Sequence, residues 1–374
     1  MSGSSRSVSS ESARVPSVVA SASSLSVFSE NATALPSVDM STSVSSESAR
    51  VSSFVSSASS QSVFWENANH RVPVQVFEGD ENMVVCVRFY PDENKLVSGS
   101  RDGTLRIWDR KTGAVLEVLS GHTTTVCDVD VSQDGKMVVS GSHDKTIRIW
   151  DGESGEAMHV FEGHEDGVWS VEFSRDSTRV MSGSWDGTVQ VLSVETGERA
   201  FEPIQCHDSV RCVRYSPSGD RIASGASGLQ IWDAATGSGI LSIRRDLSEV
   251  ALVTSLVWTA DSNHIIGDCG DTYITLWDSH NGDQLRTWKA YDHANMITTF
   301  SLSPTGTHLV TSNWLEKRAF VFDISTGEQV AVFKHARRSH GIAYSPSGKY
   351  IATGCRDTKV YVWEAPAFED PLTK

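Results

Sequence analysis

The feature that most constrains this chain is a short apolar motif that recurs seven times and ends in Trp-Asp or a close substitute. The seven copies are Ile107-Trp108-Asp109, Ile149-Trp150-Asp151, Val191-Leu192-Ser193, Ile231-Trp232-Asp233, Leu276-Trp277-Asp278, Val321-Phe322-Asp323 and Val362-Trp363-Glu364. Their central residues are 42, 42, 40, 45, 45 and 41 residues apart. A near-constant period of this size is typical of units that must stack, because one unit alone cannot bury its apolar faces.

Each unit repeats the same local signals before its marker. A Gly-His pair, an alternating strand, a Ser-Pro-x-Gly turn, a Ser-Gly-Ser strand and an Asp-Gly-Thr turn follow in order. Asp-Gly and Ser-Gly pairs favour tight reversals between antiparallel strands. In this order and register the chain resembles the WD40-repeat family from Val72 to Glu364. The resemblance implies an all-β, seven-bladed β-propeller over residues 71–366, with four antiparallel strands in each blade.

Side chains alternate between the two faces of a strand, so blade one gives a specific expectation. Val85 and Val87 in its first strand, and Leu105 and Ile107 in its third, are predicted to face neighbouring blades. Radial stacking of four-stranded blades buries both faces and leaves only short edges.

We expect the ring to close through its own N-terminal strand. Only 11 residues follow Trp363, and Pro366 among them is a poor start for another central strand. The segment from Val74 to Phe77 is similar to the outer strand of a blade. It is therefore predicted to pair with the last blade.

The resemblance also implies a hydrogen-bonded staple of His, Ser or Thr, Asp and Trp in each blade. The full set maps onto two blades, as His122, Ser140, Asp144 and Trp150 in blade two and as His335, Thr353, Asp357 and Trp363 in blade seven. A Ser, His and Asp set also suggests a hydrolase triad. Because the set recurs and the indole N–H gives the serine a structural partner, we interpret it as structural and expect no catalytic residues.

Other blades depart from this staple. The departures are Asp80 at the His position of blade one, Leu192-Ser193 at the Trp-Asp position of blade three, Glu249 at the His position of blade five and Glu316 in place of the turn Asp of blade six.

The first 70 residues form a different kind of segment. They contain 26 serines, one glycine and no lysine, with no sustained apolar period, which predicts a disordered tail. Within the tail, residues 7–32 recur as residues 43–68 with 21 of 26 positions identical. This tandem duplication is either a doubled linear motif or a duplicated neutral linker. Residues 367–374 are expected to be a short C-terminal tail.

Composition limits the class of partner. The formal net charge is −15 and no Lys/Arg-rich run or stripe is visible, so direct nucleic-acid binding is not expected. No stretch approaches the roughly 20 apolar residues that cross a bilayer, and no secretory leader is visible, so we expect a cytoplasmic or nuclear location and no membrane partner. The six cysteines form no C-x-x-C pair and are interpreted as free thiols; no metal or cofactor is expected.

By the resemblance, the residue before each turn Asp is exposed on the narrow face of the propeller. This series is Arg101, His143, Trp185, Gly270, Leu315 and Arg356, and a second series at the start of the first strands is Met83, Thr125, Gly167, Leu252, Met296 and Arg338. A closed ring makes blades seven and one neighbours. Arg101, His143, Trp185, Arg338 and Arg356 are therefore the candidate partner-binding face, suited to an acidic or phosphorylated peptide. The alternative is that they are ordinary solvated rim charges.

These features predict a non-catalytic scaffold or adaptor that binds proteins or peptides, as a monomeric propeller within a larger complex. One alternative is an acidic propeller that binds basic partners such as histone tails in a chromatin or nuclear complex. Another is a propeller-based enzyme, although no Gly-rich phosphate loop, spaced metal-ligand set or isolated nucleophile with its own base is visible outside the repeated staple.

Overall fold

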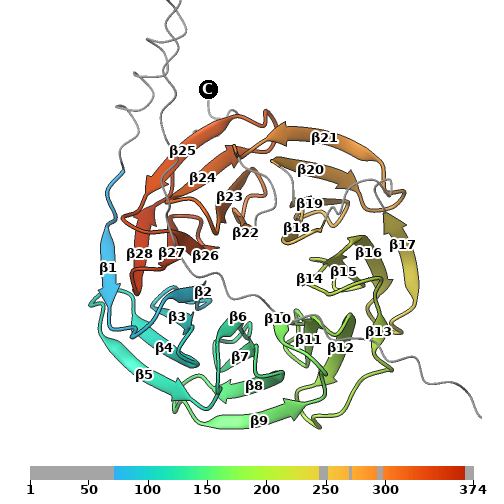
Figure 1. The fold of residues 1–374 in the computed structure, drawn as a ribbon, viewed down its shortest axis with the longest axis horizontal. Helices are drawn as coiled ribbons and strands as arrows, with labels where there is room; N and C mark the ends of the chain where they lie inside the picture. The colour runs from blue at the N-terminus through green and yellow to red at the C-terminus, as the bar shows by residue number, and fades with distance from the viewer. Residues whose placement is uncertain (1–70, 244–251, 269–271, 293–297, 367–374) are drawn as a thin grey trace, which may run out of the picture. The chain divides into compact units, whose positions relative to one another are not determined.

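The computed structural model describes residues 71–243, 252–268, 272–292 and 298–366. All 28 elements that these residues form are β-strands. They make seven antiparallel four-stranded sheets, arranged as blades around a central axis (Figure 1). The prediction of an all-β, seven-bladed propeller is confirmed.

Corresponding strands occupy the same radial position in every blade (Figure 1). The innermost strands are β2 (Val84–Phe89), β6 (Val126–Val131), β10 (Val168–Phe173), β14 (Cys212–Tyr215), β18 (Leu256–Trp258), β22 (Thr298–Leu302) and β26 (Ser339–Tyr344). The second strands are β3 (Lys95–Ser100), β7 (Met137–Ser142), β11 (Arg179–Ser184), β15 (Arg221–Ala226), β19 (His264–Asp268), β23 (His308–Asn313) and β27 (Tyr350–Cys355). The third strands are β4 (Thr104–Asp109), β8 (Thr146–Asp151), β12 (Thr188–Ser193), β16 (Gly228–Asp233), β20 (Tyr273–Asp278), β24 (Arg318–Asp323) and β28 (Lys359–Glu364). The outer strands are β5 (Val115–Ser120), β9 (Ala157–Glu162), β13 (Ile204–Gln205), β17 (Gly239–Ile243), β21 (Gln284–Lys289), β25 (Gln329–Lys334) and β1 (Gln75–Glu78).

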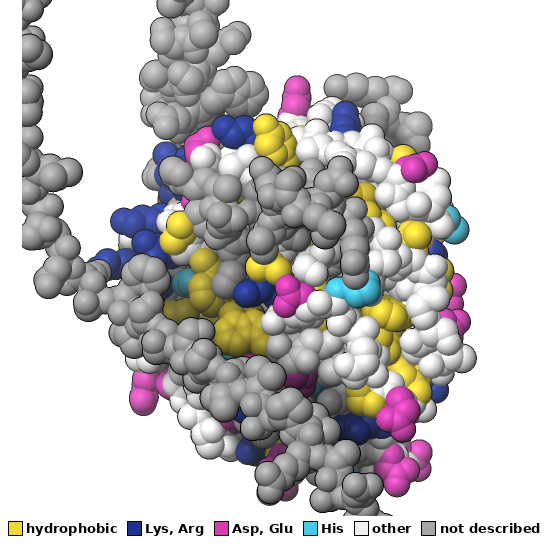
Figure 2. Space-filling view, turned by 45° about the vertical axis from the view of Figure 1, so that its right-hand side comes forward, with side chains coloured by type: hydrophobic (Ala, Val, Ile, Leu, Met, Phe, Trp, Pro, Cys, Tyr) yellow, Lys and Arg dark blue, Asp and Glu magenta, His cyan; other side chains and the backbone are white. Residues whose placement is uncertain are grey.

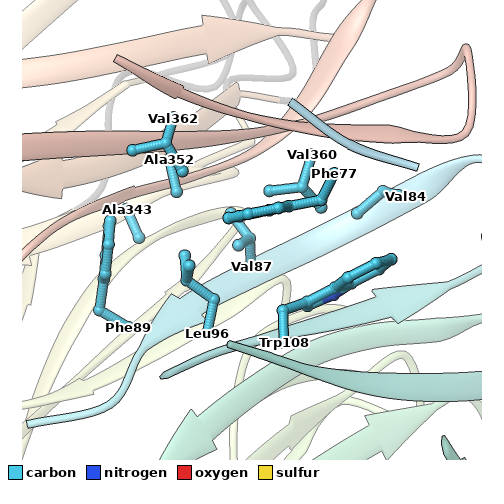
Figure 3. Packing of buried hydrophobic residues seen from close by; sticks show 10 residues of the cluster. All are labelled: Phe77, Val84, Val87, Phe89, Leu96, Trp108, Ala343, Ala352, Val360 and Val362. Carbon is cyan, nitrogen blue, oxygen red and sulfur yellow. The ribbon is translucent and has the colours of Figure 1, made fainter. Parts of the chain in front are cut away.

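The ring closes through β1, which pairs antiparallel with β28 and so becomes the outer strand of blade seven. The predicted closure is confirmed, with the strand one residue later than expected. Phe77 is 1% exposed and its ring stacks on Trp108 of blade one, with the ring centroids 5.6 Å apart. One apolar cluster spans this joint (Figure 3), formed by Phe77, Val84, Val87, Phe89, Leu96, Trp108, Ala343, Ala352, Val360 and Val362.

Most of the expected alternation in blade one is present. Leu105 and Ile107 pack in the cluster shared with blade two, and Val87 packs in the cluster shared with blade seven. The expectation for Val85 is wrong. The pairing of β2 with β3 shifts register between Val84 and Cys86, so Val84 takes the place facing blade seven. Such a β-bulge re-aims one side chain, and Val85 lines the central channel instead.

The same bulge recurs in other inner strands. Register shifts lie between Val126 and Asp128, between Val168 and Ser170, and between Ser339 and Ile342. The residues within these shifts include Cys127, Trp169 and His340. In each of these strands one extra residue therefore interrupts the regular alternation of side chains between the two faces of the blade.

The middle residue of the Ser-Gly-Ser motif is explained by the spacing between blades. A Cβ added to Gly99 would lie 2.5 Å from Cys86 Sγ and 2.7 Å from Cγ1 of Val126 in blade two. Side chains at this position would collide with the inner strands on which the blades pack, so glycine is required there.

Candidate functional site on the narrow face

The four staple residues of blade two lie within hydrogen-bond distance. Trp150 Nε1 donates to Ser140 Oγ at 2.8 Å, and Ser140 Oγ lies 2.7 Å from His122 Nε2. His122 Nδ1 lies 2.9 Å from Asp144 Oδ2. Burial raises the pKa of Asp144, but hydrogen bonds with His122 and Thr146 outweigh it and hold that pKa well below its usual value. Ser140 is fully buried and already accepts the indole N–H, so no substrate can reach it here.

Blade seven forms only part of the staple. His335 Nε2 lies 2.8 Å from Thr353 Oγ1, to which Trp363 Nε1 donates at 2.9 Å. The expected contact of Asp357 with His335 is wrong, because Asp357 accepts the hydroxyl of Tyr361 at 2.7 Å. The Tyr361 ring packs edge-on against His335, whose Nδ1 has no hydrogen-bond partner among the described residues. Burial lowers the pKa of His335 to about 4.

Other blades replace parts of the staple. In blade one, Asp80 accepts Ser98 Oγ at 3.3 Å and Arg106 Nη1 at 2.7 Å. In blade three, His164 contacts both Ser182 and Asp186 at 2.8 Å, although the tryptophan is absent. The recurrence of one buried network in several blades supports a structural role for these polar groups.

The two predicted face series lie side by side. We call the end of the ring that carries the turns between second and third strands the narrow face. There the backbone N–H groups of Arg101, His143, Trp185 and Arg356 donate to the carbonyls of Met83, Thr125, Gly167 and Arg338 at 3.0, 3.0, 3.0 and 2.9 Å. The expectations for Gly270, Met296 and Glu249 lie outside the described residues.

In blade six the predicted residue, Leu315, is 50% exposed, but the turn that carries it is longer. Arg101, His143, Trp185 and Arg356 each directly follow the last residue of a second strand. In blade six that place belongs to Trp314, which follows Asn313 and is half-buried, and Leu315 comes next. The turn over residues 314–317 is one residue longer than the turns of blades one, two, three and seven.

Aromatic rings form a continuous row across the narrow face. This aromatic bar consists of His143, Trp185, Trp169, Trp314 and His340. Successive ring centroids along it are 5.4, 4.8, 6.2 and 4.6 Å apart. Trp169 and Trp314 come from blades on opposite sides of the axis, so their contact crosses the channel (Figure 1). Figure 2 shows hydrophobic side chains at several places on the surface of the ring.

The histidines of the aromatic bar are neutral at pH 7. Burial lowers the pKa of His143, opposed by Asp166 and reinforced by Arg101. Burial also lowers the pKa of His340 to about 4, reinforced by Arg356 and Arg338. Arg338 lies two residues before His340, and the Arg356 backbone N–H donates to the Arg338 carbonyl at 2.9 Å, so two of the predicted arginines lie near this end of the aromatic bar.

Cations lie at turns and strand ends on the narrow face of three successive blades. This basic sector consists of Lys317 and Lys334 of blade six, Arg337, Arg338 and Arg356 of blade seven, and Arg101 of blade one. His335 donates its backbone N–H to the Lys317 carbonyl at 2.8 Å, which joins blade six to blade seven. A Cβ added to Gly354 would lie 2.6 Å from Val84 Cγ1, which shows how closely blade seven packs on blade one.

The basic sector is unpaired. None of its six cations has an ion-pair partner within 4.0 Å among the residues that the structure describes, whereas neighbouring Arg318 pairs with Glu316 at 2.7 Å and Lys359 with Glu78 at 2.5 Å. The six cations are scattered along the sequence, between positions 101 and 356, and come to neighbouring blades only in the closed ring.

Arg211 is a further cation at the axis that the sequence reading did not identify. Its guanidinium carbon lies 5.6 Å from the ring centroids of both Trp169 and Trp185. Its Nε is buried without a hydrogen-bond partner in the described part of the chain, and so is the indole Nε1 of Trp169. Arg214, by contrast, pairs with Asp128 at 3.5 Å.

Metal binding and membrane spanning are two further possibilities that the described ranges bear on. No group of three or more His, Cys, Asp or Glu there is arranged to hold a metal ion. The same ranges contain no helix with the length and apolarity needed to span a bilayer.

A family model of the WD domain, G-beta repeat, matches residues 71–109, 113–151, 155–192, 200–233 and 327–364. Together these stretches make up half of the chain. The chain belongs to the WD40 family. The unmatched stretch between residues 233 and 327 contains blades five and six, where the staple is most altered.

Several curated WD40 relatives are similar over part of their length. The chain is 28% identical over 120 residues to the U5 small nuclear ribonucleoprotein 40 kDa protein of Dictyostelium discoideum, covering 32% of this chain and 33% of the relative. It is 27% identical over 136 residues to cell division cycle 20.1, cofactor of APC complex, of Arabidopsis thaliana, covering 36% and 29%. It is 28% identical over 141 residues to protein groucho of Drosophila melanogaster, covering 37% and 19%. The matched region thus spans a third or less of each relative.

Proposed function

We propose that this WD40 protein is a non-catalytic scaffold or adaptor whose narrow face binds an acidic or phosphorylated segment of a protein partner. The observation that carries the proposal is the basic sector, six cations without an ion pair on adjacent blades, next to a largely half-buried aromatic row on a chain of net charge −15. Guanidinium groups bind carboxylates and phosphates in bidentate fashion, and Trp and Arg are frequent anchors of protein interfaces.

The assembly in which such a partner resides is also part of the proposal. Two relatives are named for assemblies, a small nuclear ribonucleoprotein and the APC complex. By similarity we place this chain, as one propeller, in a larger protein complex of the cytoplasm or nucleus. A partner with a basic tail is less suited to the narrow face, because like charges on the basic sector would repel it.

Charge reversal tests the proposal in the full chain. Arg101→Glu combined with Arg356→Glu removes two cations and adds two anions on the narrow face. Reversal of one buried interfacial arginine often costs about 2 kcal/mol or more, which is roughly a 30-fold loss of affinity. Affinity purification with mass spectrometry should therefore lose acidic or phosphorylated partners from the double variant.

The matched control places the same charge change on the opposite end of the ring. Lys136 and Arg175 lie in the turns between first and second strands and are exposed. Lys136→Glu combined with Arg175→Glu should leave the recovered partners unchanged. If both double variants retain the full set of partners, the narrow face is not the binding surface.

A further inference from the structure

We propose that the narrow face has two anion-binding positions and that its ligand is a peptide with two acidic or phosphorylated residues on either side of an apolar one. The inference rests on the proposed function and adds a spacing to it. One position is the basic sector on blades six, seven and one. The other is Arg211 on blade four, across the axis (Figure 1).

The Arg211 guanidinium has no hydrogen-bond acceptor among the described residues. It is half-buried, its side chain makes no hydrogen bond or ion pair in the described ranges, and its Nε is out of contact with solvent. Leaving a charged buried donor unpaired costs free energy, and such groups in folded proteins usually meet a bound ligand or ion. Cation–π contacts with Trp169 and Trp185 hold the guanidinium beside both rings, and a guanidinium can donate to a carboxylate or phosphate in bidentate fashion.

A second unpaired donor lies beside it. The indole Nε1 of Trp169 is buried and has no acceptor among the described residues. The Arg211 guanidinium lies 5.6 Å from the centre of the same tryptophan ring. One carboxylate or phosphate group, with two or more acceptor oxygens, fits both donors.

The aromatic bar sets the distance between the two positions. From Arg211 to Trp169, on to Trp314 and on to His340, the steps are 5.6, 6.2 and 4.6 Å. Arg338 lies two residues before His340, and its carbonyl accepts the Arg356 backbone N–H at 2.9 Å. An extended peptide advances about 3.3 Å per residue, so it covers this path in roughly four to six residues.

The bar also explains the residue expected between the two anions. Trp185 is 36% exposed, and Trp169 and Trp314 are half-buried around the axial hollow. Flat aromatic surfaces of this kind gain most from an apolar or aromatic side chain packed on them. The middle of the peptide should therefore be apolar.

Fluorescence anisotropy on the full chain tests the spacing. The probes are dye-labelled Ser/Gly peptides with a central Phe and two phosphoserines placed two to ten residues apart, and a matched peptide with one phosphoserine. We expect tightest binding at a spacing of four to six residues, at least tenfold tighter than the single-phosphoserine peptide. Arg211→Gln should abolish that tenfold advantage, Arg211→Lys should restore part of it, and Arg175→Gln should leave it unchanged.

The outcomes separate this inference from the proposed function. Binding that depends on Arg356 but shows no spacing optimum, or an advantage that persists in both Arg211 variants, overturns the inference alone. If no acidic peptide binds, or if a single-stranded oligonucleotide of equal charge binds more tightly, the inference and the proposed function both fail. A thermal midpoint measured for each variant shows whether it is folded.

Discussion

Closure of the ring by β1 can be tested at a single side chain. Phe77 is 1% exposed and stacks on Trp108 across the joint between blades seven and one. Truncating a buried Phe to Ala typically costs about 3–5 kcal/mol, and the aromatic pair adds roughly 1 kcal/mol. Because β1 has four residues and lies at the outer edge of its sheet, local relaxation should offset part of this cost. We therefore expect Phe77→Ala to lower the free energy of unfolding by about 3 kcal/mol.

The neighbouring residue supplies a matched control. Val76 lies on the same strand with its side chain 37% exposed, so Val76→Ala should cost less than about 1 kcal/mol. The free energies are read from urea unfolding of the full chain, followed by tryptophan fluorescence. For a ring of this size about 3 kcal/mol corresponds to a drop in Tm of roughly 6 °C or more. Equal effects of the two substitutions would refute the reasoning that β1 fastens the ring through Phe77.

A pair of deletions extends the same test. Removing residues 1–65 leaves β1 intact and should barely change the Tm. Removing residues 1–80 takes β1 away and exposes the edge of β28, so it should destabilise the ring strongly. Comparable Tm values for the two truncated chains would contradict closure by this strand.

Two further predictions concern the interior. Ser140→Ala should lower the free energy of unfolding by about 2–4 kcal/mol, because it leaves both His122 and the Trp150 indole without a hydrogen-bond partner. Ser182→Ala, in the blade without that tryptophan, should lower it by about 1–2 kcal/mol. The urea midpoints of the two variants compare these effects. Burial raises the pKa of Glu172 from 4.5 to about 7, although Arg214 opposes it, so the folded protein holds a proton that the unfolded chain releases in that range. Glu172→Gln should therefore be more stable than the wild type at pH 8 and lose this advantage as the pH falls to 5; an advantage that is constant with pH would disprove the assignment.

The fold could be predicted from the sequence because the signals that specify it are local. The period of the Trp-Asp markers fixed the number of blades, and turn residues such as Gly103, with a φ of +86°, marked the reversals between strands. The outer strand before blade one could be found because it repeats the pattern of later outer strands. These signals are all contained within one repeat or between neighbouring repeats.

The site was less readable because it depends on contacts between distant repeats. Trp169 and Trp314 are 145 positions apart and meet only because blades three and six face each other across the axis. Strict alternation also misplaced the channel residues, because the bulge at Val85 recurs in other inner strands. A usable signal was present, since Trp169 and Arg211 are 42 residues apart, the period of the repeat, and both lie where a first strand begins.

In the proposed function the unpaired cations of the narrow face hold the partner. The most direct measurement is a structure of the full chain bound to an acidic or phosphorylated peptide recovered from its partners. Our account requires the peptide to lie on the aromatic bar, with a carboxylate or phosphate oxygen about 2.8 Å from a guanidinium nitrogen of Arg338 or Arg356. A peptide seated on the opposite end of the ring or on its outer strands, without contact to these arginines, would contradict it.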